Sequence, residues 1–260
     1  IYATLGYFQI YVNWFDYWLK GKKSDVLDMP KVQYYLMGAN EWRSAPRWPV
    51  PGVEFVKFYF HSDGHANSRK GDGTLSISTP ANEPSDTFVY NPADPVPSKG
   101  GPICCISADA APPGAYDQSE IELRDDVLVY TSAPLEQGVE VTGPLEVTLY
   151  VSSSAKDTDF TVKLVDVHPD GRAYNIQEGI LRARYRQGFE KQVMMTPEDV
   201  YKITINLHAT ANYFKPNHRI RLEVSSSNFP RFTRNLNTGG NNYDETEWVK
   251  ANNVIHHSKK

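Results

Sequence analysis

From residue 22 onward the chain repeats one pattern, in which short segments rich in β-branched and aromatic residues alternate with turn signals. In residues 202–207 (KITINL), apolar and polar side chains alternate, as they do in a strand with one buried face. Turn signals such as Asp63-Gly64 and Pro169-Asp170-Gly171 separate the segments. The segments cover residues 31–37, 54–60, 85–90, 127–131, 145–151, 159–167, 180–186, 200–207 and 219–226. Many short strands without helical patterns between them favour an all-β fold, and this number is typical of a jelly-roll β-sandwich.

Two stretches depart from this pattern. Residues 91–120 are dense in proline, glycine and alanine, and they predict a long ordered excursion of the kind that often carries function. Residues 251–260 (ANNVIHHSKK) end in a polar, basic tail, and we expect no final strand there.

The first twenty residues carry one helical signal. Apolar side chains recur at helical spacing, at Tyr7, Ile10, Tyr11, Trp14, Phe15, Trp18 and Leu19. Gly21 follows as a stop signal. So large an aromatic face needs an apolar partner, either the sandwich that follows or protein outside this chain.

Charge and hydropathy exclude several classes of partner. The net charge of −4 and the pI near 6.0 give no indication of a basic surface that would bind nucleic acid or anionic lipid. No run of 18 apolar residues occurs, so no membrane span is predicted, and the opening segment lacks the features of a signal peptide. We interpret the adjacent Cys104 and Cys105 as two thiols rather than a disulfide framework.

No complete catalytic or metal-binding motif is found. A nucleophile elbow, G-x-S-x-G, surrounds none of the serines, and Ser76 in the string GTLS lacks the flanking glycines. The patterns HExxH, paired CxxC and the EF-hand loop are missing too. Asp157 and Asp159 alone make a weak calcium site, and their carboxylates are expected to cap turns. We therefore predict no catalytic residue, no metal and no cofactor in this chain.

The histidines follow the same interpretation. His61 is followed by Ser62 and Asp63, but adjacent residues cannot converge as a triad, so a structural turn is expected. His168 and His208 each close a strand-like run, and His218 is expected to form a local hydrogen bond.

Several long strings resemble one family when read together. They are WFDYWLKG (14–21), MGANEW (37–42), FHSDGHANS (60–68), FVYNPADPVPSKGG (88–101), residues 125–160, residues 163–186 and residues 215–240. Together they resemble the CocE/NonD hydrolases, which include cocaine esterase-like enzymes, α-amino-acid ester hydrolases and glutaryl acylases. The shared region is the X-Pro dipeptidyl-peptidase C-terminal domain. One departure is Asn91, where the family usually has aspartate.

The resemblance implies a galactose-binding-like jelly roll over residues 22–260, truncated at its end, after residues 1–21 as the last helix of an upstream α/β-hydrolase domain. That domain would carry the Ser, Asp and His of a serine hydrolase acting on small-molecule esters, amides or X-Pro peptides. This chain alone would then be inactive. Tyr7, Tyr11, Trp14 and Trp18 would contact the hydrolase domain, and Ile103, Cys104 and Cys105 would help to line its acyl pocket.

Three alternatives remain at this point. Ile103, Cys104 and Cys105 could simply anchor a loop in the sandwich, since cysteine is often buried. The chain could be a free-standing carbohydrate- or ligand-binding jelly-roll module. It could also be a purely structural or dimerisation domain.

Overall fold

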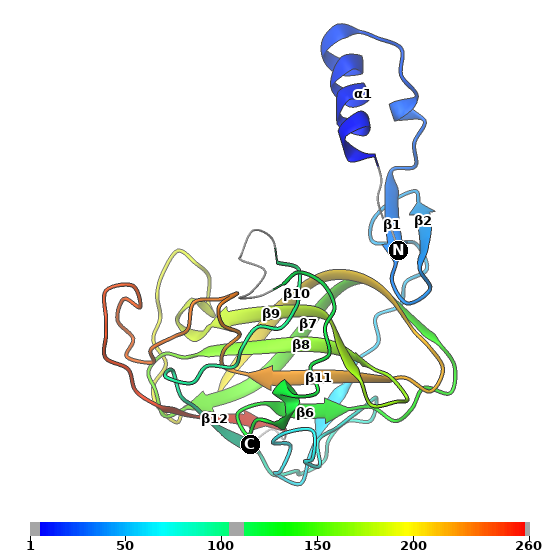
Figure 1. Cartoon of the computed structure of the whole chain (residues 1–260). Coiled ribbons are helices and arrows are strands. Elements are labelled where there is room, and N and C mark those ends of the chain that lie inside the picture. The colour runs from blue at the N-terminus through cyan, green and yellow to red at the C-terminus, as the bar shows by residue number, and fades with distance from the viewer. Residues whose placement is uncertain (1–5, 104–111, 258–260) are drawn as a thin grey trace.

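Two β-sheets packed face to face form the body of the molecule in the computed structural model, which describes residues 6–103 and 112–257 (Figure 1). One sheet has six strands in the order β3-β4-β6-β11-β8-β9, and the other has four in the order β10-β7-β12-β5. The strands are β1 (Val32–Leu36), β2 (Glu41–Ala45), β3 (Tyr59–His61), β4 (Thr74–Ser76), β5 (Asp86–Tyr90), β6 (Leu128–Thr131), β7 (Val139–Ser153), β8 (Asp159–Val167), β9 (Ala173–Arg182), β10 (Tyr201–Phe214), β11 (Arg219–Ser225) and β12 (Ala251–His256). The predicted all-β jelly-roll sandwich is confirmed.

The alternation read from the sequence places the core between the two sheets. Ile203, Ile205 and Leu207 of β10 are buried while the residues between them are exposed. Every residue of β8 is buried, because loops cover the outer face of its sheet as well. Apolar side chains from both sheets fill the centre, among them Tyr90, Tyr130, Leu149, Phe160, Leu164, Phe214 and Ile255.

The described parts of the Pro/Gly-rich excursion, residues 91–103 and 112–120, lie across the outer face of the six-stranded sheet. Gln118 donates its N–H to Ala173 of β9, and Ser98 donates its N–H to Phe229. The 3₁₀-helix η2 (Ile121–Leu123) continues this layer, and Ile121 packs in a second apolar cluster. The loop thereby buries the polar side chains that this outer face carries.

The end of the chain corrects one prediction. Residues 251–256 form β12, which pairs with β5 on one side and β7 on the other, so the expectation of no final strand is wrong. An asparagine occupies an inward position: Asn253 is fully buried, and its Nδ2 donates to Ser226 Oγ at 2.7 Å. A polar residue with a buried partner hides the apolar alternation that identifies a strand.

His256 and His257 are likewise no part of a solvated tail. His256 bonds the hydroxyls of Ser85 and Ser152, each at 3.0 Å. The His257 side chain is buried, with Nε2 2.6 Å from Asp86 Oδ2. Both histidines therefore hold β12 against its neighbours.

The N-terminal elements stand away from the sandwich in Figure 1. Helix α1 (Tyr7–Lys20) ends at Gly21, whose φ of 63° and N–H bond to the Tyr17 carbonyl make the predicted stop. The short 3₁₀-helix η1 (Asp25–Leu27) and the β1–β2 hairpin follow. Predicted strand 31–37 therefore belongs to this hairpin, which reaches the sandwich where Met37 bonds to Ala211 and Tyr213 of β10. Within the described residues, no helix is long and apolar enough to cross a membrane.

Candidate functional site

Two glycines close the base of the loop predicted to line a substrate pocket. Gly101 and Gly114 exchange backbone hydrogen bonds of 2.7 and 3.0 Å, and both have φ angles, 115° and 113°, that favour glycine. Ile103 follows this closure, half-buried, with its N–H donated to the Gly101 carbonyl at 2.8 Å. Cys104 and Cys105 lie outside the described residues, so their place in a pocket stays a prediction.

A buried ion pair supports this loop base. Arg231 Nη1 lies 2.5 Å from Glu178 Oε1, and Asn228 Nδ2 donates to the other carboxylate oxygen at 3.0 Å. A Cβ at Gly101 would stand 2.7 Å from Glu178 Oε1 and 2.8 Å from Arg231 Nη1. A side chain at this position would push the Glu178 carboxylate and the Arg231 guanidinium aside, and the φ of 115° disfavours one as well, so glycine suits the close approach of the loop to the ion pair.

More charged groups are buried under the same loop. Lys163 Nζ lies 3.4 Å from Glu223 Oε2 and donates to Gln118 Oε1 at 2.8 Å. Arg221 Nη1 donates to Glu122 Oε2 at 2.6 Å. Burial raises the pKa of Glu223 to about 7, although the nearby Lys163 ammonium opposes this rise. The layer between loop and sheet is thus a polar network with one carboxyl that titrates near neutrality.

This carboxyl gives the fold a testable pH dependence. Because the folded pKa of Glu223 lies above its ordinary value of 4.5, the folded state holds the proton to higher pH than the unfolded state does. Glu223 therefore lowers the free energy of unfolding as pH rises from about 4.5 to about 7, by at most about 1.4 kcal/mol per pH unit. In urea unfolding at pH 5, 6 and 7, Glu223→Gln should gain stability relative to the unmodified chain as pH rises.

Glu120→Gln is the matched control, since the Glu120 side chain is 87% exposed and should leave the pH dependence unchanged. A constant difference between Glu223→Gln and the unmodified chain across this range would contradict the assignment.

Helix α1 presents an aromatic face that nothing among the described residues covers. Asp16, on the opposite side, pairs with Lys20 at 2.6 Å and Lys22 at 2.7 Å, so the polar side meets the segment that follows the helix. No residue of α1 is buried. The aromatic face consists of the four residues predicted to contact another domain, with exposed fractions of 52% for Tyr7, 61% for Tyr11, 44% for Trp14 and 59% for Trp18.

The side chains of a serine, a histidine and a glutamate also lie within hydrogen-bonding distance of one another in series, which the sequence did not reveal. His61 Nε2 lies 3.1 Å from Ser76 Oγ, and its Nδ1 lies 2.7 Å from Glu83 Oε1. This order matches a hydrolytic triad. However, Ser76 Oγ already accepts the N–H of Ser78 at 3.2 Å, and the Ser78 carbonyl lies 3.0 Å from His61 Nε2. These contacts hold the β3–β4 hairpin to residues 77–83, and they tie the Ser76 hydroxyl and the His61 ring nitrogen to the Ser78 backbone in a structural turn.

Ser62, by contrast, does what its turn position predicts. Its Oγ accepts the N–H of Gly64 at 2.7 Å and that of His65 at 3.2 Å. Its own hydroxyl donates to Asp86 Oδ1 at 2.7 Å. Ser62 therefore stabilises a turn.

Asp157 and Asp159 are buried and paired with arginines. Asp157 accepts the N–H and Nε–H of Arg184, while Asp159 accepts Nε–H of Arg182 at 2.8 Å. Asn235 Nδ2 donates to both carboxylates, at 2.7 and 2.8 Å. Burial raises the pKa of Asp159, although the Arg182 guanidinium opposes this rise. Because arginines and Asn235 are their partners, these carboxylates neutralise and bond buried side chains of the sandwich instead of forming the weak calcium site considered from the sequence.

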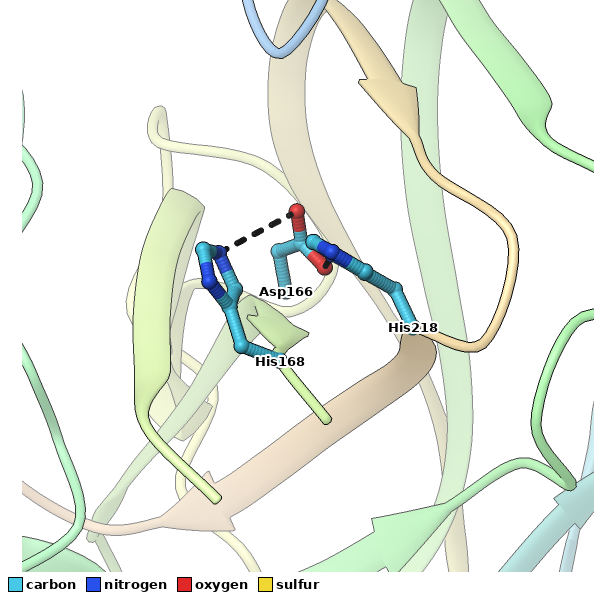
Figure 2. A group of neighbouring side chains, drawn as sticks. All are labelled: Asp166, His168 and His218. Carbon is cyan, nitrogen blue, oxygen red and sulfur yellow. Dashed lines mark hydrogen bonds and ion pairs between the residues drawn. The ribbon is translucent and has the colours of Figure 1, made fainter. Parts of the chain in front are cut away.

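Asp166, His168 and His218 gather at one end of the six-stranded sheet (Figure 2). The backbone N–H of His218 makes the expected local bond, to the Lys215 carbonyl at 3.1 Å, whereas its side-chain Nδ1 bonds the distant Asp166 Oδ1 at 2.8 Å. His168 Nε2 lies 4.0 Å from Asp166 Oδ2. Burial lowers the pKa of His168, against the pull of Asp166. Asp166 and His168 are two residues apart, but His218 lies 50 residues beyond His168, so the sequence could reveal the group only through strand register.

A shallow hollow of about 860 Å³ lies beside β5 and β12, lined largely by asparagine and aspartate side chains. Arg124 bonds both Asp94 and Asp126 there. Asn91, where the resemblance led us to expect aspartate, accepts the N–H two residues on at 3.2 Å with its side-chain oxygen, as a turn-capping residue does. Ile103 does not line this hollow.

Comparison with known proteins identifies relatives over nearly the whole chain. Residues 24–260 match the family described as the X-Pro dipeptidyl-peptidase C-terminal non-catalytic domain. Cocaine esterase of Rhodococcus sp. (strain MB1 Bresler) is 47% identical over 226 residues, which cover 87% of this chain and 39% of that protein.

Solved structures agree. An aminopeptidase from a marine sediment Thaumarchaeota archaeon superposes with a TM-score of 0.78 and 29% identity, over 97% of this chain and 42% of the other. An α-amino acid ester hydrolase superposes with a TM-score of 0.80 and 27% identity, over 95% of this chain and 42% of the other. The chain thus spans about two fifths of the length of these relatives.

Proposed function

Because this chain belongs to the X-Pro dipeptidyl-peptidase C-terminal domain family of CocE/NonD-type hydrolases, we propose that it supports a serine hydrolase whose nucleophile lies in an upstream α/β-hydrolase domain. The substrate would be a small-molecule ester, an amide or an X-Pro peptide. In the partner domain, serine would attack the acyl carbon, histidine would take the proton and aspartate would orient the histidine. We assign residues 1–21, which contain α1, to the last helix of that domain, and residues 22–260 to the jelly-roll domain, with the β1–β2 hairpin as its connection to the helix.

The aromatic face of α1 carries this proposal. Four large aromatic side chains on one side of a helix, each more than 40% exposed, form an apolar surface of the kind that marks an interface. Interfaces between domains are rich in Trp and Tyr at their centres. The relatives are more than twice as long as this chain, which leaves room in such proteins for the domain that covers this face.

The loop that begins at Ile103 supplies the second part of the proposal. It starts from a rigid base, because Gly101 and Gly114 close it and the Arg231–Glu178 pair lies directly beneath. We assign Ile103, Cys104 and Cys105 to the wall of the acyl pocket, where apolar and soft side chains would exclude water from the acyl group.

Ester hydrolysis by the two-domain protein and by its hydrolase part alone tests this function. Removal of residues 22–260 should lower kcat/KM on an acyl-nitrophenyl ester at least tenfold, because the pocket loses one wall. Labelling by an active-site phosphonate serves as the control that the hydrolase part is still folded. Unchanged kcat/KM would favour a purely structural or dimerisation role instead. Sugar binding by the 260-residue chain would favour the free-standing carbohydrate-binding alternative.

A further inference from the structure

Two histidines and an aspartate bring three metal-ligand atoms together at one end of the sandwich (Figure 2). The donors are one imidazole nitrogen each from His168 and His218 and one carboxylate oxygen from Asp166, all within 4.8 Å of one another. We propose that Asp166, His168 and His218 form a binding site for a divalent transition-metal ion, with Zn²⁺ as the reference ion.

Strand register brings these residues together. In the antiparallel ladder between β8 and β11, Val167 is opposite Arg219, so the next pair outward places His168 opposite His218. Asp166 precedes His168 by two residues and therefore lies on the same face of the sheet. Cross-strand neighbours on one face are within reach of each other. The backbone of two central strands, rather than a chance arrangement of surface side chains, thus sets the spacing.

The backbone of both histidines is fixed as well. The N–H and C=O of His168 make hydrogen bonds of 2.8 and 2.9 Å, and those of His218 make bonds of 3.1 and 2.9 Å. The Asp166 and His218 side chains are only 7% and 11% exposed. Ligands held this firmly lose little freedom when an ion binds.

The distances between donor atoms suit a zinc-sized ion. Zn²⁺ with bonds of about 2.0–2.1 Å in tetrahedral geometry separates its ligand atoms by roughly 3.3 Å. His218 Nδ1 is 2.8 Å from Asp166 Oδ1, and His168 Nε2 is 4.0 Å from Asp166 Oδ2. The first separation would open by roughly 0.5 Å and the second would close by roughly 0.7 Å. Because the two contacts use different oxygens of Asp166, the carboxylate would either turn to offer one oxygen to the ion or bind it through both.

His168 indicates a missing partner. Within the part of the chain that the structure describes, neither of its ring nitrogens makes a hydrogen bond. Its ring instead packs at a tilt against His218 and Tyr174, with centroids 4.3 and 4.9 Å away. The side chain is 31% exposed, so an ion and its water can reach it from solvent. An ion would give this ring the polar partner that Asp166, at 4.0 Å, does not.

The ligand types select the class of metal. Two imidazoles and one carboxylate suit Zn²⁺, Co²⁺, Ni²⁺ or Cu²⁺, whereas Ca²⁺ and Mg²⁺ prefer all-oxygen sites. The nearest cationic side chain on this turn, Arg172, is paired with Asp170 at 2.6 Å, so its charge is largely compensated. Three protein ligands leave a further position for water. A bound ion would join the end of β8 to the start of β11 and stabilise the sandwich.

Zn²⁺ titration of the metal-free 260-residue chain by isothermal calorimetry tests the site. We expect one ion per chain, and a melting temperature that rises by about 5 °C at a Zn²⁺ concentration 100-fold above Kd. Because loss of an outer-shell partner alone weakens metal sites about 10–100-fold, loss of a ligand in His168→Gln should weaken binding at least about 100-fold. Co²⁺ should report the same site by visible absorption of a low-coordinate complex.

His65→Gln is the matched control, since His65 is an exposed histidine in a turn outside the cluster and its loss should leave Zn²⁺ affinity unchanged. Asp166→Asn gives a second variant in which the carboxylate alone is lost. Absence of Zn²⁺ binding by the unmodified chain, or equal affinity in His168→Gln and the unmodified chain, would overturn the proposal.

Discussion

Replacing Asp157 by alanine should lower the free energy of unfolding by about 3–5 kcal/mol, because it leaves a buried arginine without its counter-charge. The Arg184 side chain is only 6% exposed, and Asp157 accepts its N–H at 2.9 Å and its Nε–H at 2.8 Å. Asn235, which bridges Asp157 and Asp159, would lose one acceptor as well. Urea unfolding followed by tryptophan fluorescence or circular dichroism measures the difference.

Asp170→Ala is the matched control for this prediction. Asp170 also pairs with an arginine, Arg172 at 2.6 Å, but the two side chains are 51% and 55% exposed. An exposed pair of this kind contributes less than about 1 kcal/mol. If both alanine variants lost the same small amount of unfolding free energy, the buried ion pair of Asp157 with Arg184 would not stabilise the sandwich as we describe.

Replacing Trp14 and Trp18 together by alanine should detach α1, and with it the jelly roll, from the rest of the proposed hydrolase domain in the two-domain protein. A tryptophan at the centre of an interface commonly contributes at least about 2 kcal/mol, and each 1.4 kcal/mol is a factor of ten in affinity. We therefore expect kcat/KM on an acyl-nitrophenyl ester to fall at least tenfold. Limited proteolysis between the domains should become faster.

The same variant should leave the jelly roll itself intact, because neither tryptophan is buried among the described residues. Gln9→Ala provides the control on the polar side of α1, where the Gln9 side chain donates to Asn13 Oδ1 at 2.7 Å, and it should keep full activity. Unchanged activity in the double tryptophan variant would remove the main support for the aromatic face as a domain interface.

The architecture could be predicted because alternation survives wherever one face of a strand is apolar. Residues 159–167 are a strand with the predicted bounds, and the helix ends at Gly21 as expected. Residues 54–60 were predicted as a strand, but only Tyr59–His61 pair in the sheet. Alternation alone does not tell a paired strand from an extended connection.

The clusters of polar residues could not be predicted in the same way. His61, Ser76 and Glu83 come from different segments, and only the pairing of β3 with β4 brings the first two together. The buried position of Asn253 likewise depends on a partner in another strand, Ser226. Hydrogen-bond partners distant in sequence leave no periodic signal in the chain. The exposed aromatic face is different, because helical spacing alone identified its four residues.

Our central proposal is that this chain supports a serine hydrolase without supplying its nucleophile, and labelling with an activated fluorophosphonate tests it most directly. The reagent should leave the intact mass of the 260-residue chain at 29.4 kDa, since no serine has the flanking glycines of a nucleophile elbow and Ser76 Oγ is already hydrogen-bonded. A stoichiometric adduct on a serine of this chain, above all one on Ser76 that disappears in His61→Gln, would contradict the account.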